Sequence, residues 1–171
     1  MSLIRGRVWK FGDNVSTDLL MPTQSMFGKV PEEEMKNYCL YADRPDFARK
    51  VQRGDIVVAG KNFGCGSSRP ASKNLLSLGV GCVLAESMGA IFFRNSINLG
   101  LPVLSLEGIS EFFQEGDEAE VDLSTGEVKN LRTGAVLKAG PIPDDLLKIL
   151  SSGGIIPYLR EEARAGRLYK N

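Results

Sequence analysis

Residues 56–106 read IVVAGKNFGCGSSRPASKNLLSLGVGCVLAESMGAIFFRNSINLGLPVLSL. Three short apolar runs in this stretch, at 56–60, 80–85 and 102–106, are typical of buried strands. Between them lie two longer segments with the character of helices, each of which ends at a glycine. Strands that alternate with helices in this way form parallel βαβ units. The middle of the chain therefore predicts a parallel sheet covered by helices.

The sequence on either side of this stretch predicts a second kind of sheet. Residues 3–11 have the β-branched and aromatic character of a first strand. From residue 118, short alternating runs separated by Gly-containing turns predict an antiparallel meander. The predicted helices cover 31–41, 46–51, 71–79, 88–99, 143–152 and 155–165, and the segment 19–30 is predicted to be a loop. We therefore expect one α/β domain over residues 1–171, with a mixed parallel and antiparallel sheet and flanking helices.

Composition and charge exclude several classes of protein. The chain is 43% hydrophobic and 25% charged, which is ordinary for a globular domain and argues against disorder. Its 21 basic and 21 acidic residues cancel, whereas proteins that bind nucleic acid usually carry a basic excess. No apolar run approaches the roughly 20 residues of a membrane span, and the first five residues do not form a signal core. We expect a cytoplasmic protein with neither nucleic acid nor membrane as a partner.

Histidine and cysteine usage limits the possible chemistry. The sequence has no histidine, which excludes Ser-His and Cys-His dyads and imidazole metal ligands. Its three cysteines, Cys39, Cys65 and Cys82, are far apart and odd in number, which favours a reducing compartment over disulfides. Alone they cannot complete a zinc site or a four-thiolate iron–sulfur cluster. We therefore expect no metal bound by this chain alone.

The turn GKNFGCGSSRP at 60–70 is unusual in composition. Its three glycines permit close approach of a ligand to the backbone. Ser67 and Ser68 are predicted to lie at a helix N-terminus, where free N–H groups favour negative charge. Arg69 adds a bidentate donor suited to a carboxylate. The turn therefore predicts an anion site.

Two other interpretations of this turn remain open, and two are excluded. The serines are also compatible with simple helix capping, and the glycines with a turn that only closes a sheet. Cys65 lacks a histidine base, and a small semi-buried structural residue is the alternative to a nucleophile. A phosphate loop is excluded because Ser-Ser-Arg follows the last glycine, and the dinucleotide fingerprint fails because Arg69 replaces its third glycine.

Four motifs together resemble one known family. They are GDNxxTD at 12–18, RGD at 53–55, GxNFGCGSSR at 60–69 and NSxNxG at 95–100. This combination is similar to the small subunits of the isopropylmalate isomerase branch of the aconitase superfamily. The resemblance covers most of the chain and implies a swivelling β/β/α domain, which agrees with the mixed sheet expected above.

The resemblance also implies a reaction and a partner. Members of the family are hydro-lyases that isomerise hydroxy acids by dehydration and rehydration. A [4Fe–4S] cluster and its cysteines belong to a separate large subunit, and that cluster binds the leaving hydroxyl as a Lewis acid. The resemblance thus implies no cofactor in this chain, a large iron–sulfur subunit as partner in a heterodimer or heterotetramer, and a small hydroxy dicarboxylate as substrate.

The resemblance assigns roles residue by residue. Ser67 matches the catalytic base, and Ser68 and Arg69 match residues that hold a substrate carboxylate. Apart from these matches, Asp18 is expected to support this loop as a hydrogen-bond acceptor, although an ordinary turn residue is an equal alternative. Three further loop residues count as supporting: Asn62, Gly64 and Gly66.

Two features depart from the family pattern or bear on the substrate. Pro70 and Ala71 stand where Glu-His is common, which indicates a divergent subfamily. The loop that contacts the variable arm of the substrate contains no cation before Lys29. Its residues Gln24, Ser25, Met26 and Phe27 are therefore expected to line an apolar arm, unless Met26 and Phe27 only pack the loop.

Several functions remain compatible with the sequence. Isomerisation of isopropylmalate in leucine biosynthesis is the expectation that fits best. Related hydratases of dimethylmalate, methylmalate (citraconate) or homoaconitate use the same chemistry. A non-catalytic anion-binding or assembly module is the alternative from another class.

Overall fold

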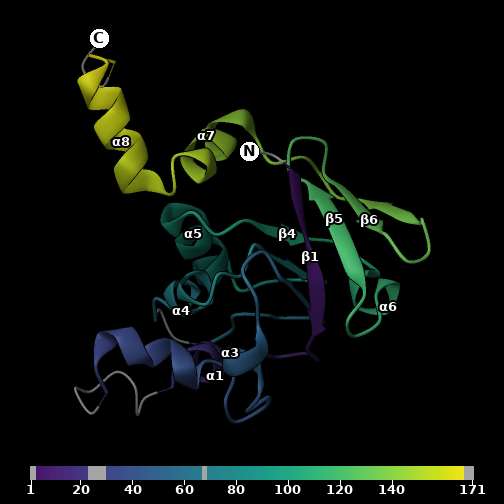
Figure 1. The fold of residues 1–171 in the computed structure, drawn as a ribbon. Helices are drawn as coiled ribbons and strands as arrows, with labels where there is room; N and C mark the ends of the chain where they lie inside the picture. Colours follow the sequence, from purple (N-terminus) through teal and green to yellow (C-terminus); the bar gives the residue numbers. More distant parts are fainter. Residues whose placement is uncertain (1–2, 23–29, 67–68, 168–171) are drawn as a thin grey trace.

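The structure is a computed structural model that describes residues 3–22, 30–66 and 69–167 (Figure 1). Within these residues, seven strands form a sheet in the order β4-β3-β2-β1-β5-β6-β7. β1 to β4 run parallel to one another, and β5 to β7 continue from β1 as an antiparallel meander. The strands are β1 (Leu3–Lys10), β2 (Ile56–Ala59), β3 (Cys82–Ala85), β4 (Val103–Ser105), β5 (Glu118–Asp122), β6 (Glu127–Asn130) and β7 (Val136–Lys138).

The first strand joins the two halves of the sheet. Its end at Val8–Lys10 pairs in parallel with β2, and its beginning at Leu3–Arg7 pairs antiparallel with β5. Gly6 lies two residues before Val8, where the pairing with β2 begins, and a Cβ at Gly6 would overlap the carbonyl group of Gly54. The absence of a side chain at this position therefore lets the chain before β2 pass close to β1.

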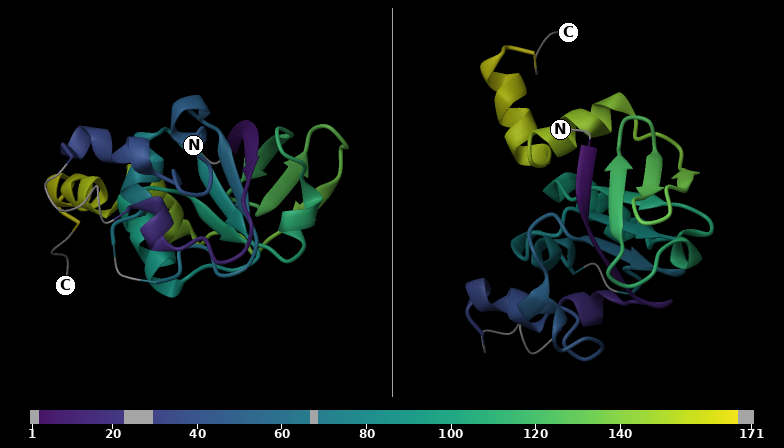
Figure 2. Two further views of the ribbon diagram at one scale, coloured as in Figure 1. Left: turned by 90° about the horizontal axis from the view of Figure 1, so that it is seen from below. Right: turned by 45° about the vertical axis from the view of Figure 1, so that its right-hand side comes forward.

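Helices cover the parallel strands. α4 and α5 pack against each other on the side away from the meander, while α6 contacts β2 and β3 (Figures 1 and 2). Every residue of β2 and β3 is buried, as expected for parallel strands covered on both faces. The helices are α1 (Thr17–Leu20), the 3₁₀ helix η1 (Glu32–Tyr38), α3 (Phe47–Lys50), α4 (Ser72–Ser77), α5 (Ala90–Leu99), α6 (Ile109–Phe112), α7 (Asp144–Ser151) and α8 (Ile155–Arg164).

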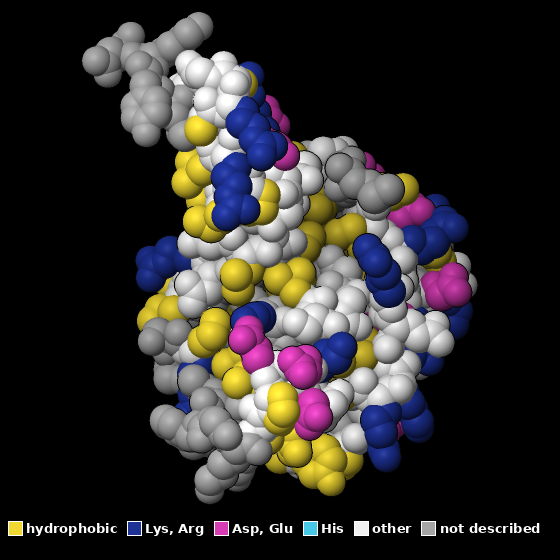
Figure 3. Space-filling model, turned by 60° about the vertical axis from the view of Figure 1, so that its left-hand side comes forward, with side chains coloured by type: hydrophobic (Ala, Val, Ile, Leu, Met, Phe, Trp, Pro, Cys, Tyr) yellow, Lys and Arg dark blue, Asp and Glu magenta, His cyan; other side chains and the backbone are white. Residues whose placement is uncertain are grey.

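The last helix projects from the body of the molecule. α8 contacts α5 and α7 and extends beyond them, with hydrophobic side chains on one flank and Lys and Arg on another (Figure 3). Its residues Ile156 and Leu159 are exposed. Within residues 3–22, 30–66 and 69–167, no helix has the length and hydrophobicity that crossing a membrane requires.

The predicted fold class is confirmed, and four local elements differ from expectation. The segment from residue 19 was predicted as a loop, yet Leu19 and Leu20 belong to α1, whose single turn is too short for a periodic signal. The helix expected from residue 31 is the 3₁₀ helix η1, none of whose residues is buried. The single turn α6 was not predicted. α4 begins at Ser72 rather than at the serines before it.

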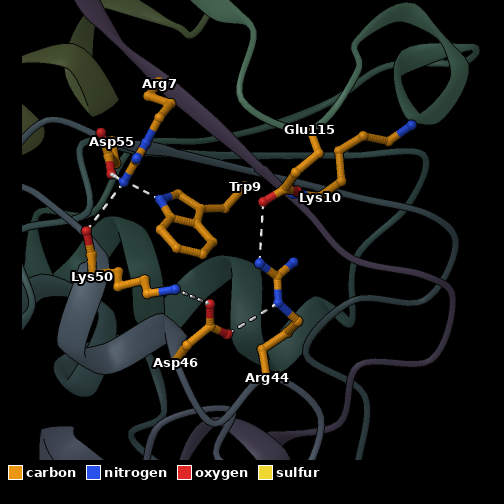
Figure 4. Close-up of polar contacts among 8 residues, drawn as sticks. All are labelled: Arg7, Trp9, Lys10, Arg44, Asp46, Lys50, Asp55 and Glu115. Atoms are coloured by element: carbon orange, nitrogen blue, oxygen red, sulfur yellow. Dashed lines mark hydrogen bonds and ion pairs between the residues drawn. The ribbon is translucent and has the colours of Figure 1, made fainter.

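A polar cluster ties α3 to β1 (Figure 4). The Trp9 ring lies between two guanidinium groups, with the Cζ atoms of Arg7 and Arg44 at 4.8 and 5.0 Å from the ring centroid. The buried carboxylate of Asp55 accepts hydrogen bonds from Trp9 Nε1 at 2.8 Å, Gln52 N at 2.9 Å and Arg7 Nη2 at 3.1 Å. Asp55 therefore satisfies donors from both β1 and the segment that follows α3.

Replacement of Asp55 by alanine should destabilise the fold. Asp55→Ala leaves the buried Trp9 Nε1–H and the Gln52 N–H without their acceptor. The expected loss is about 2–4 kcal/mol of unfolding free energy, at roughly 1–3 kcal/mol for each unsatisfied buried donor. Urea denaturation followed by Trp9 fluorescence measures this loss.

Asp46→Ala is the matched control within the same cluster. Asp46 pairs with Lys50 and Arg44 at 3.2 and 3.5 Å, but its side chain is one-third exposed. Exposed ion pairs contribute less than about 1 kcal/mol to stability, so the unfolding free energy of Asp46→Ala should be close to that of the parent chain. Equal losses in the two variants would contradict the role given to Asp55.

Candidate functional site

The glycine-rich loop after β2 pairs with the segment that follows β1. The loop, residues 60–66, runs beside residues 12–17, so the two most distinctive motifs of the sequence are neighbours in the structure. Three backbone hydrogen bonds of 2.7–2.8 Å make this pairing: Asn14 N to Lys61 O, Gly64 N to Val15 O, and Thr17 N to Cys65 O. The side-chain amide of Asn62 adds a fourth bond, to Asn14 Oδ1 at 2.9 Å. The pairing fixes a loop that belongs to no regular element.

The other side of the loop is held by the segment after β3. Phe63 N donates to Ser87 O at 3.0 Å, and Gly89 N donates to Phe63 O at 2.8 Å. The Phe63 ring is fully buried and packs edge-on against Phe92 of α5, with 5.3 Å between the ring centroids. Backbone hydrogen bonds on both sides of the loop and the packing of Phe63 against α5 therefore fix the loop, as a preorganised binding loop requires.

Two glycines of the loop are required by its geometry. Gly64 has φ +70°, and a Cβ there would overlap the Phe92 ring. Gly66 has φ +103° and lies beside α1, where a Cβ would be 3.3 Å from Thr17 Oγ1. Both positions thus need a residue that tolerates the left-handed region of the backbone map.

Arg69 is held by α1. Its Nη1 donates to the carbonyl oxygen of Met21 at 2.9 Å and lies 2.8 Å from Asp18 Oδ1. Asp18 and Met21 are three positions apart, which places them on one side of the helical turn. The Arg69 side chain is 20% exposed and that of Asp18 is 64% exposed, so the pair lies at the surface. The structure brings together Asp18 and Arg69, which are 51 positions apart in the printed sequence.

The remaining predicted site residues lie outside the described residues. These are Ser67 and Ser68 of the glycine-rich turn, and Gln24, Ser25, Met26 and Phe27 of the loop after Pro22. The residues on either side of the serines, Gly66 and Arg69, both lie against α1. Three of the supporting residues, Asn62, Gly64 and Gly66, lie in the glycine-rich loop at 60–66, which is called the clamped loop below because both of its sides are hydrogen-bonded. Asp18 lies against Arg69.

The expectation that the serines start the next helix is wrong. α4 begins at Ser72, and its N-cap residue Ala71 makes no side-chain capping bond. Pro70 explains the delay, because a residue that precedes proline is disfavoured in the α region. The anion site therefore cannot rest on the N-terminus of α4, and the charge of Arg69 is the feature that remains.

Sequence reasoning missed two residues around the end of α1, and only one of them carried a signal. The contact from Met21 is made by its backbone carbonyl, which any residue could supply. Asn74, a buried residue of α4, donates from Nδ2 to Leu20 O at 2.9 Å. A polar residue among the apolar positions of a helix was the available signal for Asn74.

The cysteines do not form a metal site. Among the residues that the structure describes, no group of three Cys, Asp or Glu side chains could hold a metal ion. Burial raises the pKa of the Cys39 and Cys82 thiols well above its usual value, which disfavours the thiolate that a cluster needs. The described residues of this chain therefore do not fit an iron–sulfur cluster.

Charged side chains flank the Arg69 region. Lys73 of α4 forms an ion pair with Glu32 of η1. The hydrogen bond and the charge of Lys73 lower the pKa of Glu32 below its usual value. This pair is exposed and has no net charge, so it contributes little to the stability or the charge of the site.

Comparison with known proteins gives consistent matches. The pattern of the aconitase C-terminal domain family matches residues 14–108. The chain is 51% identical over 162 residues to the isopropylmalate/citramalate isomerase small subunit of Methanocaldococcus jannaschii, covering 94% of this chain and 96% of that protein. It is 49% identical to the 3-isopropylmalate dehydratase small subunit 1 of Thermotoga maritima, covering 93% and 96%. A crystal structure of 3-isopropylmalate dehydratase from Methanocaldococcus jannaschii superposes with a TM-score of 0.88 at 34% identity, covering 96% of this chain and 97% of that one.

Substitution of Gly64 should be more harmful than a positive φ alone explains. Gly64→Ala combines a left-handed backbone with a Cβ that overlaps Phe92. We expect a loss of about 1–2 kcal/mol from the backbone and a further 1–3 kcal/mol from overpacking. Gly134→Ala is the control, because Gly134 has φ +75° with open space around its Cβ position. Urea unfolding should show a larger loss of unfolding free energy for Gly64→Ala than for Gly134→Ala. Equal losses would show that the loop moves to accommodate the extra methyl group.

Proposed function

Since the chain belongs to the aconitase C-terminal domain family and, by near-full-length identity, to its 3-isopropylmalate dehydratase small subunits, we propose that it is the small subunit of a hydro-lyase that interconverts 2-isopropylmalate and 3-isopropylmalate. The observation that carries this proposal is 49–51% identity to named small subunits over almost the whole of each protein. The clamped loop beside Arg69 supports it independently. The proposal includes one swivel-type domain over residues 1–171 and a cytoplasmic role in leucine biosynthesis.

Arg69 is proposed to bind a substrate carboxylate together with Ser68. A guanidinium offers several N–H donors in one plane, which suits a carboxylate. Contacts of Nη1 with Asp18 and Met21 O hold this group in one orientation at the surface. A preoriented cation loses little further freedom when the substrate arrives, which favours binding.

Ser67 is proposed to be the general base. Its oxygen, as the alkoxide, takes the proton from the carbon next to a substrate carboxylate; the electrons of that C–H bond form the alkene as hydroxide leaves the adjacent carbon. A serine hydroxyl is a weak acid, so the alkoxide needs nearby donors or cations and exclusion of water. The glycine-rich loop at residues 60–66, which precedes Ser67 in the chain, is the part of this protein from which such donors can come.

The group that binds the leaving hydroxyl is proposed to lie in a large subunit. The described residues of this chain do not fit an iron–sulfur cluster, and the relatives are themselves named as small subunits. A [4Fe–4S] cluster on that partner would supply the Lewis acid that binds the hydroxyl. The proposed assembly is a heterodimer or heterotetramer in which this chain contributes the base and the carboxylate-binding arginine.

The variable arm of the substrate is proposed to be apolar. The segment Gln24, Ser25, Met26 and Phe27 contains no cation, and an unpaired carboxylate against apolar side chains is unfavourable. An isopropyl or a methyl arm fits this composition. The methyl arm is a specific second candidate, because one relative is named an isopropylmalate/citramalate isomerase small subunit.

Removal of the Ser67 hydroxyl should abolish catalysis without preventing assembly. In the complex with a cognate large subunit and reconstituted cluster, Ser67→Ala should reduce kcat by at least about 1000-fold, because no other base replaces it. Formation of the alkene intermediate, followed by its ultraviolet absorbance, measures the rate. Co-purification of the two subunits is the control, and each subunit alone should be inactive. Near-normal turnover by Ser67→Ala would overturn the assignment of the base.

The assembled enzyme should discriminate against a third carboxylate. We expect kcat/KM for homocitrate to be at least about 100-fold below that for isopropylmalate or citramalate, because the extra carboxylate would lack a partner. Met26→Arg supplies a cation and should reduce the ratio of kcat/KM for isopropylmalate to kcat/KM for homocitrate. The apolar control Met26→Leu should leave this ratio unchanged. Equal turnover of homocitrate by the parent enzyme would contradict the proposed apolar arm.

A further inference from the structure

Asn74 connects three elements from inside the molecule. It lies on α4 and is 3% exposed. Its Nδ2 donates to Leu20 O at 2.9 Å and, more weakly, to Met35 O at 3.4 Å. Leu20 ends α1 and Met35 lies in η1. One side-chain amide on α4 therefore contacts both α1 and η1, which precede and follow the segment 24–27 proposed to line the variable arm of the substrate.

α1 depends on contacts of this kind. It has four residues, far fewer than a helix needs to be stable by itself. Its start is fixed by Ser16, whose hydroxyl accepts from Leu19 N at 3.3 Å, and by the bond of Thr17 N to the glycine-rich loop. Its end leaves carbonyl groups without helical partners, and Asn74 supplies the donor for Leu20 O.

The bond from Asn74 lies next to the bond that holds Arg69. Met21 follows Leu20 directly, and its carbonyl oxygen accepts from Arg69 Nη1 at 2.9 Å. Asp18, the other acceptor for Nη1, belongs to the same helical turn. Any shift of the end of α1 therefore moves these two acceptors of Arg69 Nη1.

We propose that Asn74 is a positioning residue for substrate-carboxylate recognition, acting through α1 on the orientation of Arg69. This proposal rests on the proposed function of Arg69. We take Arg69 to bind the carboxylate on the carbon that loses hydroxide, a group that keeps its charge throughout the reaction. Its contacts therefore strengthen the ground state and the transition state equally, and weakening them raises KM and leaves kcat nearly unchanged.

A double-mutant cycle in the assembled enzyme tests the proposal. Asn74→Leu removes the amide and keeps the branching and the number of heavy atoms of the side chain. It should raise KM for isopropylmalate about tenfold and change kcat less than about twofold. Arg69→Ala should raise KM by more, and adding Asn74→Leu to Arg69→Ala should have no further effect on KM, because residues that act through one contact are not additive.

Ser72→Ala is the matched control. Ser72 lies on the same helix, is fully buried, and shares a 2.7 Å hydrogen bond with Ser96 of α5 rather than with α1. Its loss should loosen α4 and lower the melting temperature while KM stays within about twofold of the parent value. This control separates a general weakening of α4 from a displacement of α1.

A second readout does not require catalysis. In the isolated full-length chain, the NMR signal of the Arg69 Nε–H group, identified by its absence in Arg69→Lys, should shift in Asn74→Leu and stay in place in Ser72→Ala. If Asn74→Leu does not fold, Asn74→Ser takes its place, because the shorter hydroxyl cannot span the distance to Leu20 O.

The outcomes separate this proposal from the function on which it rests. An unchanged KM in Asn74→Leu, an equal rise of KM in the Arg69→Ala background, or an unmoved Arg69 signal would overturn the role of Asn74. The proposed function fails by a different result, which is the absence of hydratase activity in the assembled parent enzyme. In that case the NMR comparison still decides whether Asn74 orients Arg69.

Discussion

The pairing of residues 13–17 with residues 60–65 is the constraint on which the candidate site depends. Both segments are loops by themselves, and neither has a helical or strand periodicity that would define its shape. Because three backbone bonds join them, the glycine-rich loop gains rigidity of the kind that strand pairing gives, although it lies outside the sheet. The same pairing sets the start of α1, so Asp18 and Arg69 meet as a direct result of it.

The sheet supports this site through β1. Because β1 pairs with β2 on one side and with β5 on the other, the segment that leaves its end emerges between the two halves of the sheet, directly beside the end of β2. The two loops that pair to form the site therefore start from neighbouring strands. The cluster around Trp9 and Asp55 joins β1 to the segment that connects α3 with β2. The site is thus preorganised by main-chain geometry more than by side-chain contacts.

Much of this arrangement could be predicted from the sequence, and the failures have physical causes. The parallel strands were predictable because four consecutive buried positions leave a continuous apolar run, as at 82–85. The Arg69 and Asp18 positions were predictable as motif residues, yet their ion pair was not, because it depends on a loop pairing without periodicity. The start of α4 was predicted within one residue, but the assignment of Ser67 and Ser68 to its N-terminus was wrong because the rule for capping serines outweighed the effect of Pro70 on the residue before it. The role of Met21 was beyond prediction, since a backbone carbonyl has no residue preference.

The central place of β1 also has a consequence for synthesis of the chain on the ribosome. Val8 finds its partner Ile56 early, but Gly6 pairs with Ala119, which is translated only after the whole parallel layer. During that interval Leu3–Arg7 of β1, the residues that pair with β5, present unsatisfied main-chain donors and acceptors. Unpaired strand edges of this kind allow nascent polypeptides to associate with one another. Completion of the meander is therefore a late and slow step, set by the long loop that must close before β5 can dock.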